Sequence, residues 1–190
     1  MFAVAVSASA QGSSGEWSFD SLMGNLASRQ SSHVAFREVK RLKVLDSSLT
    51  QRGTLIYTSP DTVIRLVEYP KKERFEIKGD QFTYEKDGKK KTVQLNARPA
   101  ALAFVDAFRS ILSGNKELLN KYYRVTYTDL GGEAWEMRLV PREESLGNLV
   151  SSFVWRGKGI KINRIEITQK NGDSTSIMLF PIAESQDGKK

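Results

Sequence analysis

The sequence predicts a mainly β protein of the α+β class, in which a strongly curved antiparallel sheet forms an incomplete barrel with helices on its concave face. In residues 53–84, apolar residues alternate with polar ones in four short runs. Each run ends at a turn signal, such as Ser59-Pro60-Asp61 or Gly79-Asp80, as expected of an antiparallel meander with one apolar face. Along the whole chain, roughly ten strand-like runs accompany only two helical stretches, and no parallel crossover separates them. Such a sheet must curve strongly or form an open barrel.

Length and composition fit one domain with a substantial core, since the chain has 190 residues of which 39% are hydrophobic. The 29 Lys and Arg residues exceed the 22 acidic residues and give a formal charge of +7. This excess would suit an acidic partner or an anionic membrane surface, although a solvated basic surface is the commoner meaning. No cysteine is present, which excludes disulfides, thiol catalysis, a lipid-modified cysteine and most structural zinc sites within this sequence.

The first ten residues are small, apolar and uncharged, and Ala8-Ser9-Ala10 has the small-x-small form of a secretory cleavage site. We therefore expect residues 1–16 to be a signal-peptide remnant and flexible leader. Residues 17–182 are expected to form a single half-barrel domain, and residues 183–190 a disordered tail.

Two segments have helical periodicity. The first should begin with Ser18 as the N-cap and end near Arg29, because its apolar residues fall at i, i+3, i+4 and i+7. The second should run from Pro99 to Ser113, with Gly114 as the stop signal, and a shorter turn is expected at 115–119. The apolar stripe of the second helix is broad and comprises Leu102, Phe104, Val105, Phe108, Ile111 and Leu112.

Strands are expected on either side of these helices. Besides the central meander, the runs lie near residues 32–45, 51–59, 92–95, 123–129, 134–140, 149–156, 161–169 and 175–180. The turn Asn171-Gly172 between the last two is a strong hairpin signal.

The sequence contains little that could perform catalysis. His33 is the only histidine, so a Ser-His-Asp triad would have to rest on this one residue, and a site with several histidine ligands cannot form. Gly157 and Gly159 lie between two strands and open no helix, which makes them a turn and not a phosphate loop. Acidic pairs such as Glu143 and Glu144 lie in turns beside basic residues. We predict no enzyme, no metal and no cofactor.

Two interpretations of the apolar face compete. Alternating aromatic and basic residues could form a stacking surface for single-stranded nucleic acid. However, the charged residues Arg74 and Lys78 alternate with Phe75 and Ile77, which places charges and apolar side chains on opposite faces. The alternation therefore favours an apolar ligand on the concave face, with the helices as a lid.

The order of motifs resembles the periplasmic outer-membrane lipoprotein carrier proteins. The features are a leader ending at Ala10, a helix ending near Arg29, the strand SSHVAFRE at 31–38, and GTLIYTSP at 53–60 followed by Pro70. The resemblance extends from about Trp17 to Phe180. It implies an incomplete antiparallel barrel closed by helices, which shields the acyl chains of lipids or lipoproteins across the periplasm without a cofactor and without catalysis.

Three positions depart from the pattern of these carriers. They usually have an Arg where this chain has Ser59, and that Arg holds the lid helices and links their opening to cargo entry. Glu38 stands where the family has Gln, and Arg65 where it often has an aromatic residue. The departures suggest a divergent relative, with a lipoprotein, a lipid, a glycolipid or an acylated envelope intermediate as cargo.

We therefore expect a periplasmic, non-enzymatic carrier. Ser59 and Arg65 are the possible latch to the lid helices or contacts to the headgroup of the cargo. Its partners would be acylated cargo and membrane-associated donor and acceptor proteins, without nucleic acid, and the protein would be a monomer. The alternative is a structural or sensor domain of the same fold that binds a protein or lipid without transport. The residues expected to line the apolar cavity are Leu55, Tyr57, Phe75, Ile77, Phe82, Tyr84, Leu102, Val105, Phe108, Leu112, Trp135, Met137, Leu139, Phe153, Ile165 and Ile167.

Overall fold

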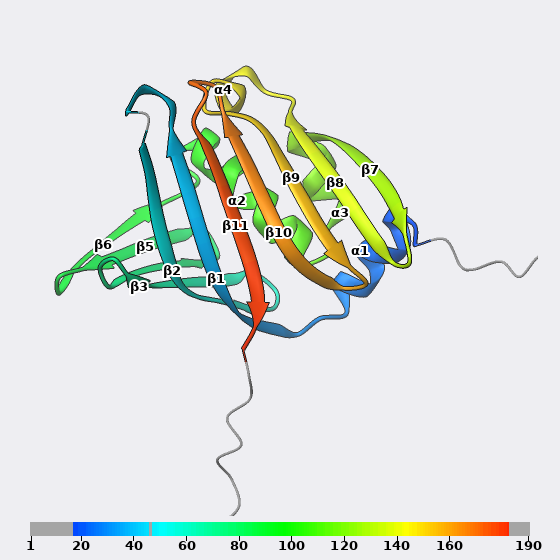
Figure 1. The fold of residues 1–190 in the computed structure, drawn as a ribbon, viewed down its shortest axis with the longest axis horizontal. Helices are drawn as coiled ribbons and strands as arrows, with labels where there is room; N and C mark the ends of the chain where they lie inside the picture. Colours follow the sequence, from blue (N-terminus) through cyan, green and yellow to red (C-terminus); the bar gives the residue numbers. More distant parts are fainter. Residues whose placement is uncertain (1–16, 46, 183–190) are drawn as a thin grey trace, which may run out of the picture.

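A computed structural model describes residues 17–45 and 47–182, in which eleven strands form one antiparallel sheet (Figure 1). The strand order is β6-β5-β4-β3-β2-β1-β11-β10-β9-β8-β7. The expected leader (1–16) and tail (183–190) lie outside the described residues. The strands are β1 (Ser31–Leu42), β2 (Ser47–Thr58), β3 (Thr62–Tyr69), β4 (Glu73–Lys78), β5 (Gln81–Lys86), β6 (Lys89–Gln94), β7 (Tyr123–Gly131), β8 (Ala134–Pro141), β9 (Val150–Lys158), β10 (Lys161–Gln169) and β11 (Ser174–Pro181).

This topology confirms the predicted incomplete barrel. Strand β1 pairs with β2 on one side and with β11 on the other, so the first and last strands of the chain meet in the middle of the sheet. Strands β6 and β7 are its two edges and do not pair with each other, which leaves the barrel open. We call strands β2 to β6 the first arm of the sheet and strands β7 to β11 the second arm.

Four α-helices accompany the sheet in the described part of the chain: α1 (Phe19–Ala27), α2 (Pro99–Leu112), α3 (Lys116–Tyr122) and α4 (Glu144–Gly147), with a 3-10 turn at Lys43–Leu45. Helix α1 begins as expected, since the Ser18 hydroxyl accepts a hydrogen bond from the Ser21 amide at 3.1 Å. Helix α2 begins at Pro99 as predicted and ends at Leu112, one residue before the predicted end, with Ser113 as its C-cap. The short α4 was not expected. None of these helices is long and apolar enough to cross a membrane.

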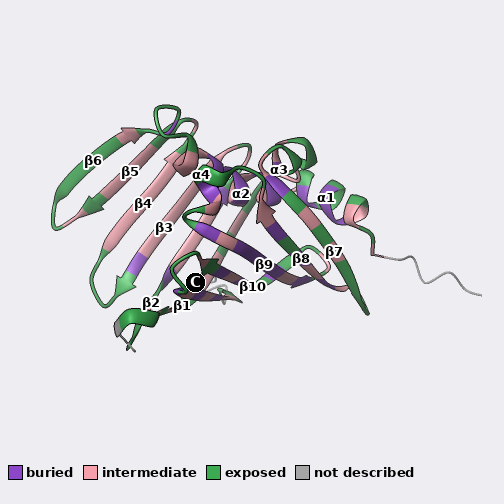
Figure 2. Ribbon diagram, turned by 90° about the horizontal axis from the view of Figure 1, so that it is seen from above, coloured by how far each residue is buried: buried purple, intermediate pink, exposed green. Residues whose placement is uncertain are grey.

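The helices lie inside the arch of the sheet but on one side of it, as Figure 2 shows. The second arm carries the buried positions beneath them, whereas the first arm extends away and is mostly half-buried. The largest fully buried side chains include Trp135, Phe153 and Trp155 of the second arm and Leu22 and Ile111 of the helices. The hydrophobic core therefore sits between the helices and the second arm.

The first arm bends away from the middle of the sheet at Gly53. The β2–β3 register shifts between Arg52 and Gly53, and irregularities of this kind bend a sheet. A Cβ at Gly53 would lie 1.8 Å from the Leu66 carbonyl oxygen, so only glycine permits this approach of the two strands. The bend helps to carry strands β3 to β6 away from the helices.

Candidate ligand-binding groove

The register places the predicted strand residues on one face of the sheet. Cross-strand pairs join Leu55 to Arg65, Arg65 to Phe75 and Phe75 to Tyr84 across the first arm. In the second arm, Ile167 pairs with Phe153 and Phe153 with Leu139, and the helices pack against this face. All of these side chains thus face the concavity, but the two arms surround them differently.

The predicted residues of the second arm form a closed core. They are Trp135, Met137, Leu139 and Phe153 with no exposed surface, Ile165 at 3% and Ile167 at 8%. The Phe153 ring contacts the rings of Phe104 and Phe108 from α2, with centroids 5.4 and 5.8 Å away. Cargo could reach this part of the face only if the helices moved.

The predicted residues of the first arm lie beside an open groove. Phe75 stacks on Tyr84 with ring centroids 4.9 Å apart, and Phe82 lies 6.3 Å from Phe75. These rings and Ile77 are only half-buried. Together with Lys91, Val93 and Arg98, the three rings line a groove of about 350 Å³, which falls within the range of small-molecule sites.

The remaining predicted residues are buried or half-buried, and none of them lines the groove. Leu55 is half-buried and packs against the core, whereas Tyr57 is buried and donates a hydrogen bond to the Pro60 carbonyl at 3.3 Å. On α2, Phe108 and Leu112 also pack against the core. The other two α2 residues are Val105, which is buried, and Leu102, which is half-buried in the first turn.

Arg65 lies on the concave face, next to Phe75. Its Nη2 donates hydrogen bonds to Glu38 Oε2 at 2.9 Å and to Gln51 Oε1 at 2.8 Å. Its guanidinium lies over the rings of Phe36 and Phe75, at 4.7 and 5.5 Å from their centroids. Two acceptors and two aromatic faces therefore hold this cation against the sheet.

The charge of Arg65 is balanced within the sheet. Burial lowers the pKa of the Arg65 guanidinium, and the carboxylates of Glu38 and Glu73 oppose this shift. Glu73 also accepts a hydrogen bond from Lys86 at 2.5 Å, which raises the pKa of Lys86. Both cations thus already have carboxylate partners.

Ser59 and Arg65 do not link the sheet to the helices in this structure, but Arg109 does. The Ser59 amide donates to the Gln30 carbonyl at 2.8 Å. Arg109, from α2, donates to the Gly79 carbonyl at 3.2 Å and forms an ion pair with Asp61 at 3.6 Å. The guanidinium therefore comes from the helix and its partners from the turns of the first arm. The resemblance to the carriers implies the reverse, with the Arg at the position of Ser59 in the sheet and its partners in the lid helices.

We expect Arg109→Gln to loosen α2. A hydrogen bond involving a charged group contributes about 1.5 kcal/mol or more, so amide exchange across residues 99–112 should rise by roughly tenfold. Hydrogen exchange measured by mass spectrometry checks this result. Lys116→Gln is the matched control, because Lys116 pairs with Asp20 at 2.8 Å on an exposed surface, where ion pairs contribute little. Equal exchange in both variants would show that Arg109 does not hold the helix.

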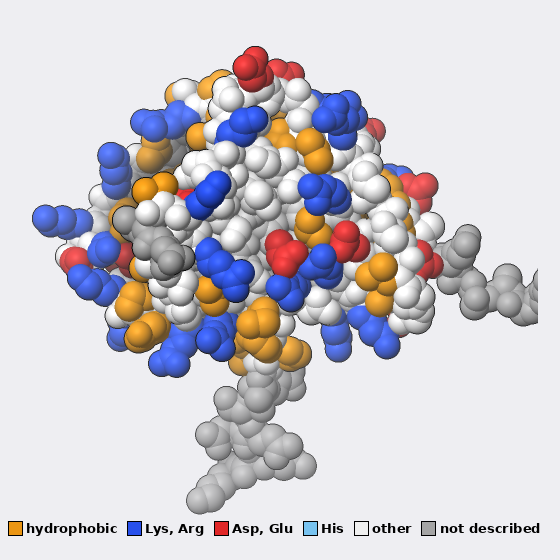
Figure 3. Space-filling view, turned by 45° about the horizontal axis from the view of Figure 1, so that its top comes forward, with side chains coloured by type: hydrophobic (Ala, Val, Ile, Leu, Met, Phe, Trp, Pro, Cys, Tyr) orange, Lys and Arg blue, Asp and Glu red, His pale blue; other side chains and the backbone are white. Residues whose placement is uncertain are grey.

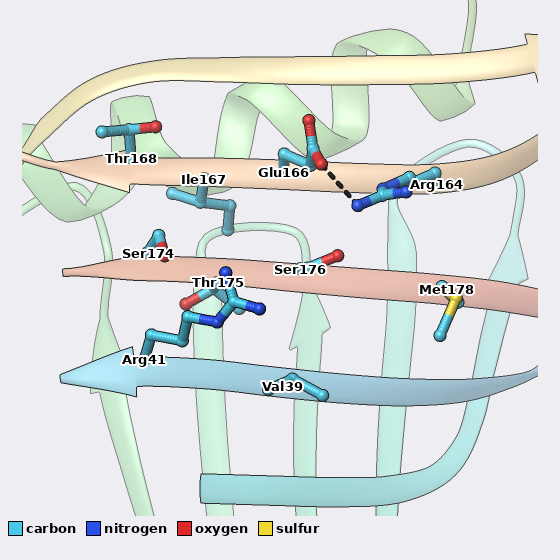
Figure 4. A pocket seen from close by; sticks show the side chains of 10 residues that line it. All are labelled: Val39, Arg41, Arg164, Glu166, Ile167, Thr168, Ser174, Thr175, Ser176 and Met178. Atoms are coloured by element: carbon cyan, nitrogen blue, oxygen red, sulfur yellow. Dashed lines mark ion pairs between the residues drawn. The ribbon is translucent and has the colours of Figure 1, made fainter. Parts of the chain in front are cut away.

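A second depression lies on the opposite face of the sheet, over β1, β11 and β10 (Figure 4). It encloses about 340 Å³, and its lining combines hydroxyl and charged side chains with Val39, Ile167 and Met178. Arg164 in this depression pairs with Glu166 at 2.7 Å. No aromatic ring of the described residues lines this depression, in contrast to the groove of the first arm.

Sequence reasoning missed Val93, Lys91 and Arg98 of the groove. Lys91 and Val93 lie on the same face of the sheet as Tyr84 and Phe82, with which they pair across β5 and β6. The signal for these residues is that alternation, continued from β5 into β6. No cluster of three or more potential metal-ligating side chains occurs among residues 17–45 and 47–182.

Comparisons with known proteins agree with this architecture. The sequence matches the model of a family described as outer membrane lipoprotein carrier protein LolA-like, over residues 10–188. A search of curated proteins gave no match. Among solved structures, a domain from Vibrio parahaemolyticus described as outer membrane lipoprotein-sorting is similar, with a TM-score of 0.51, 10% identity, and coverage of 92% of this chain and 94% of the other. A LolA superfamily protein from Nitrosomonas europaea has a TM-score of 0.46, 9% identity and coverage of 92% and 97%.

Proposed function

Because the chain belongs to the outer membrane lipoprotein carrier protein LolA-like family, we propose that it is a non-enzymatic carrier that shields the acyl chains of a lipid or lipoprotein. The proposal places it in the periplasm, where it would move cargo between the inner and outer membranes. Membrane-associated donor and acceptor proteins would load and unload it, and the monomer would be the working form. Its cargo would lie in the groove of the first arm.

One observation supports this proposal above all. The first arm presents three aromatic rings, those of Phe75, Phe82 and Tyr84, on a concave face that the helices leave half-exposed. An uncovered aromatic surface inside a curved sheet costs free energy in water, because its apolar area remains hydrated. A bound acyl chain would remove this cost.

The physical need for such a carrier is large. Each methylene transferred from water to an apolar site contributes roughly 0.8 kcal/mol, so a long acyl chain crosses an aqueous compartment only when it is covered. The groove offers a site of about 350 Å³ beside α2. Further room for cargo would open if α2 moved off the core, with Arg109 as the contact that resists this motion.

We expect Phe82→Glu to abolish most binding of a neutral apolar dye such as Nile red. The new carboxylate would stand in the aromatic lining of the groove, where its desolvation costs several kcal/mol, and the affinity should fall by roughly tenfold or more. Fluorescence titration of the purified protein provides the measurement. Phe180→Glu is the matched control, since Phe180 is 45% exposed and its pairing with Ala35 places it on the opposite face.

Mass spectrometry of the lipids that co-purify with the periplasmic protein tests the carrier role directly. Wild-type protein should carry acylated molecules, and Phe82→Glu protein should carry fewer. A folded wild-type protein free of lipid and unable to bind the dye would contradict the proposal and favour a module that binds a protein partner.

A further inference from the structure

Two cations of the concave face are paired with carboxylates, and two others line the groove. Arg65 is paired with Glu38, and Lys86 with Glu73. Lys91 and Arg98 line the groove, yet neither forms an ion pair within the part of the chain that the structure describes. No carboxylate lines the groove. Its polar lining therefore carries an uncompensated positive charge.

The register arranges the concave face of the first arm in rows. One row is apolar and runs through Ile77, Phe82 and Val93. The next row runs through Phe75, Tyr84 and Lys91, so two rings lead directly to a cation. An amphiphile with its tail on the first row would meet Lys91 at the second.

Arg98 adds positive charge where α2 begins. It occupies the N-cap position of α2, and no side chain caps this end of the helix. The amides of the first turn give a helix a partial positive charge at its N-terminus, so the field of α2 has the same sign as Arg98. Figure 3 shows that Lys and Arg side chains also gather at the left edge of the molecule, where Figure 1 places the first arm.

We propose that the groove selects amphiphiles with an anionic headgroup, a carboxylate or phosphate attached to an acyl chain, and that Lys91 and Arg98 recognise this headgroup. The inference rests on the proposed function, because it assigns the headgroup of a cargo whose chain lies on Phe75, Phe82 and Tyr84. Neutral lipids of equal chain length would gain the apolar contacts alone. Cationic amphiphiles would be repelled by both side chains.

Displacement of Nile red from the purified protein tests the assignment, with palmitate and its methyl ester as competitors. Both share one chain and differ in charge. Palmitate should displace the dye at a concentration about tenfold lower than its methyl ester does. This difference should shrink as salt is raised, because salt screens the charge of palmitate and not the apolar contacts of the ester. The double variant Lys91→Gln/Arg98→Gln should lose this preference, so that palmitate and the ester displace the dye at similar concentrations. The control Lys72→Gln/Lys90→Gln removes the same charge from positions outside the groove. This control variant should keep the preference for palmitate over the ester.

The outcomes separate the two proposals. Equal affinities for palmitate and its ester in wild-type protein would overturn headgroup selection and leave the carrier role intact. Failure to bind either compound or the dye would overturn both. Inorganic phosphate is the third competitor, and its displacement of palmitate at a similar concentration would show a site for a free anion, which also overturns the assignment. Loss of preference in the control variant would mean that overall charge, and not Lys91 and Arg98, is responsible.

Discussion

Replacement of Phe153 by Ala is expected to lower the free energy of unfolding by about 3–5 kcal/mol. Phe153 has no exposed surface, and its ring contacts Phe104, Phe108 and Tyr123, with centroids 5.4 to 5.8 Å away. The substitution would leave a cavity between β9 and α2 that rigid strands and a buried helix face cannot close. Urea denaturation followed by tryptophan fluorescence gives the measurement.

The matched control is Phe82→Ala, on the same face of the sheet but in the open groove. Phe82 is only half-buried, so this substitution should lower the free energy of unfolding by about 1 kcal/mol. It should also weaken Nile red binding. The two variants thus distinguish a closed core from an open site. A loss at Phe153 as small as that at Phe82 would show that the second arm is loosely packed and belongs to the cargo cavity itself.

The face on which each strand residue lies could be predicted from the sequence, because the side-chain period of a strand is two. Phe75, Ile77, Phe82 and Tyr84 share the concave face for this reason. Which arm the helices cover could not be predicted. That choice depends on contacts such as Phe108 with Trp155, whose ring centroids lie 5.1 Å apart although the residues are distant in sequence.

The charged contacts of the site were harder to foresee than its apolar ones. Arg109 lies three residues after Asp106, and the two are 3.4 Å apart, which is a local pairing that the sequence permits. Its contacts with Gly79 and Asp61, however, need the turns of the first arm to approach α2. The direction in which Arg65 points was equally open, because both faces of β3 carry apolar residues and only the register places it beside Glu38 and Gln51.

Replacement of Gly114 by Ala is expected to lower the free energy of unfolding by roughly 3 kcal/mol or more. Gly114 follows the C-cap residue of α2 and has φ at +64°, a backbone conformation that costs an alanine about 1–2 kcal/mol. Its Cβ would also lie 2.2 Å from the Met23 carbonyl oxygen and 2.5 Å from the Ala27 amide nitrogen of α1. Helix α1 would have to shift, although Leu22 and Leu26 have no exposed surface beneath it.

Gly88→Ala separates the two causes of this loss. Gly88 also has a positive φ, +72°, but a Cβ there would meet no atom within 4 Å, so only the conformational cost of about 1–2 kcal/mol applies. The further loss in Gly114→Ala measures how firmly α1 is held against the end of α2. Faster amide exchange confined to residues 19–27 should accompany it. Equal losses in the two variants would mean that α1 moves aside at little cost, and the part of the cover that yields to cargo would then be α1 and not α2.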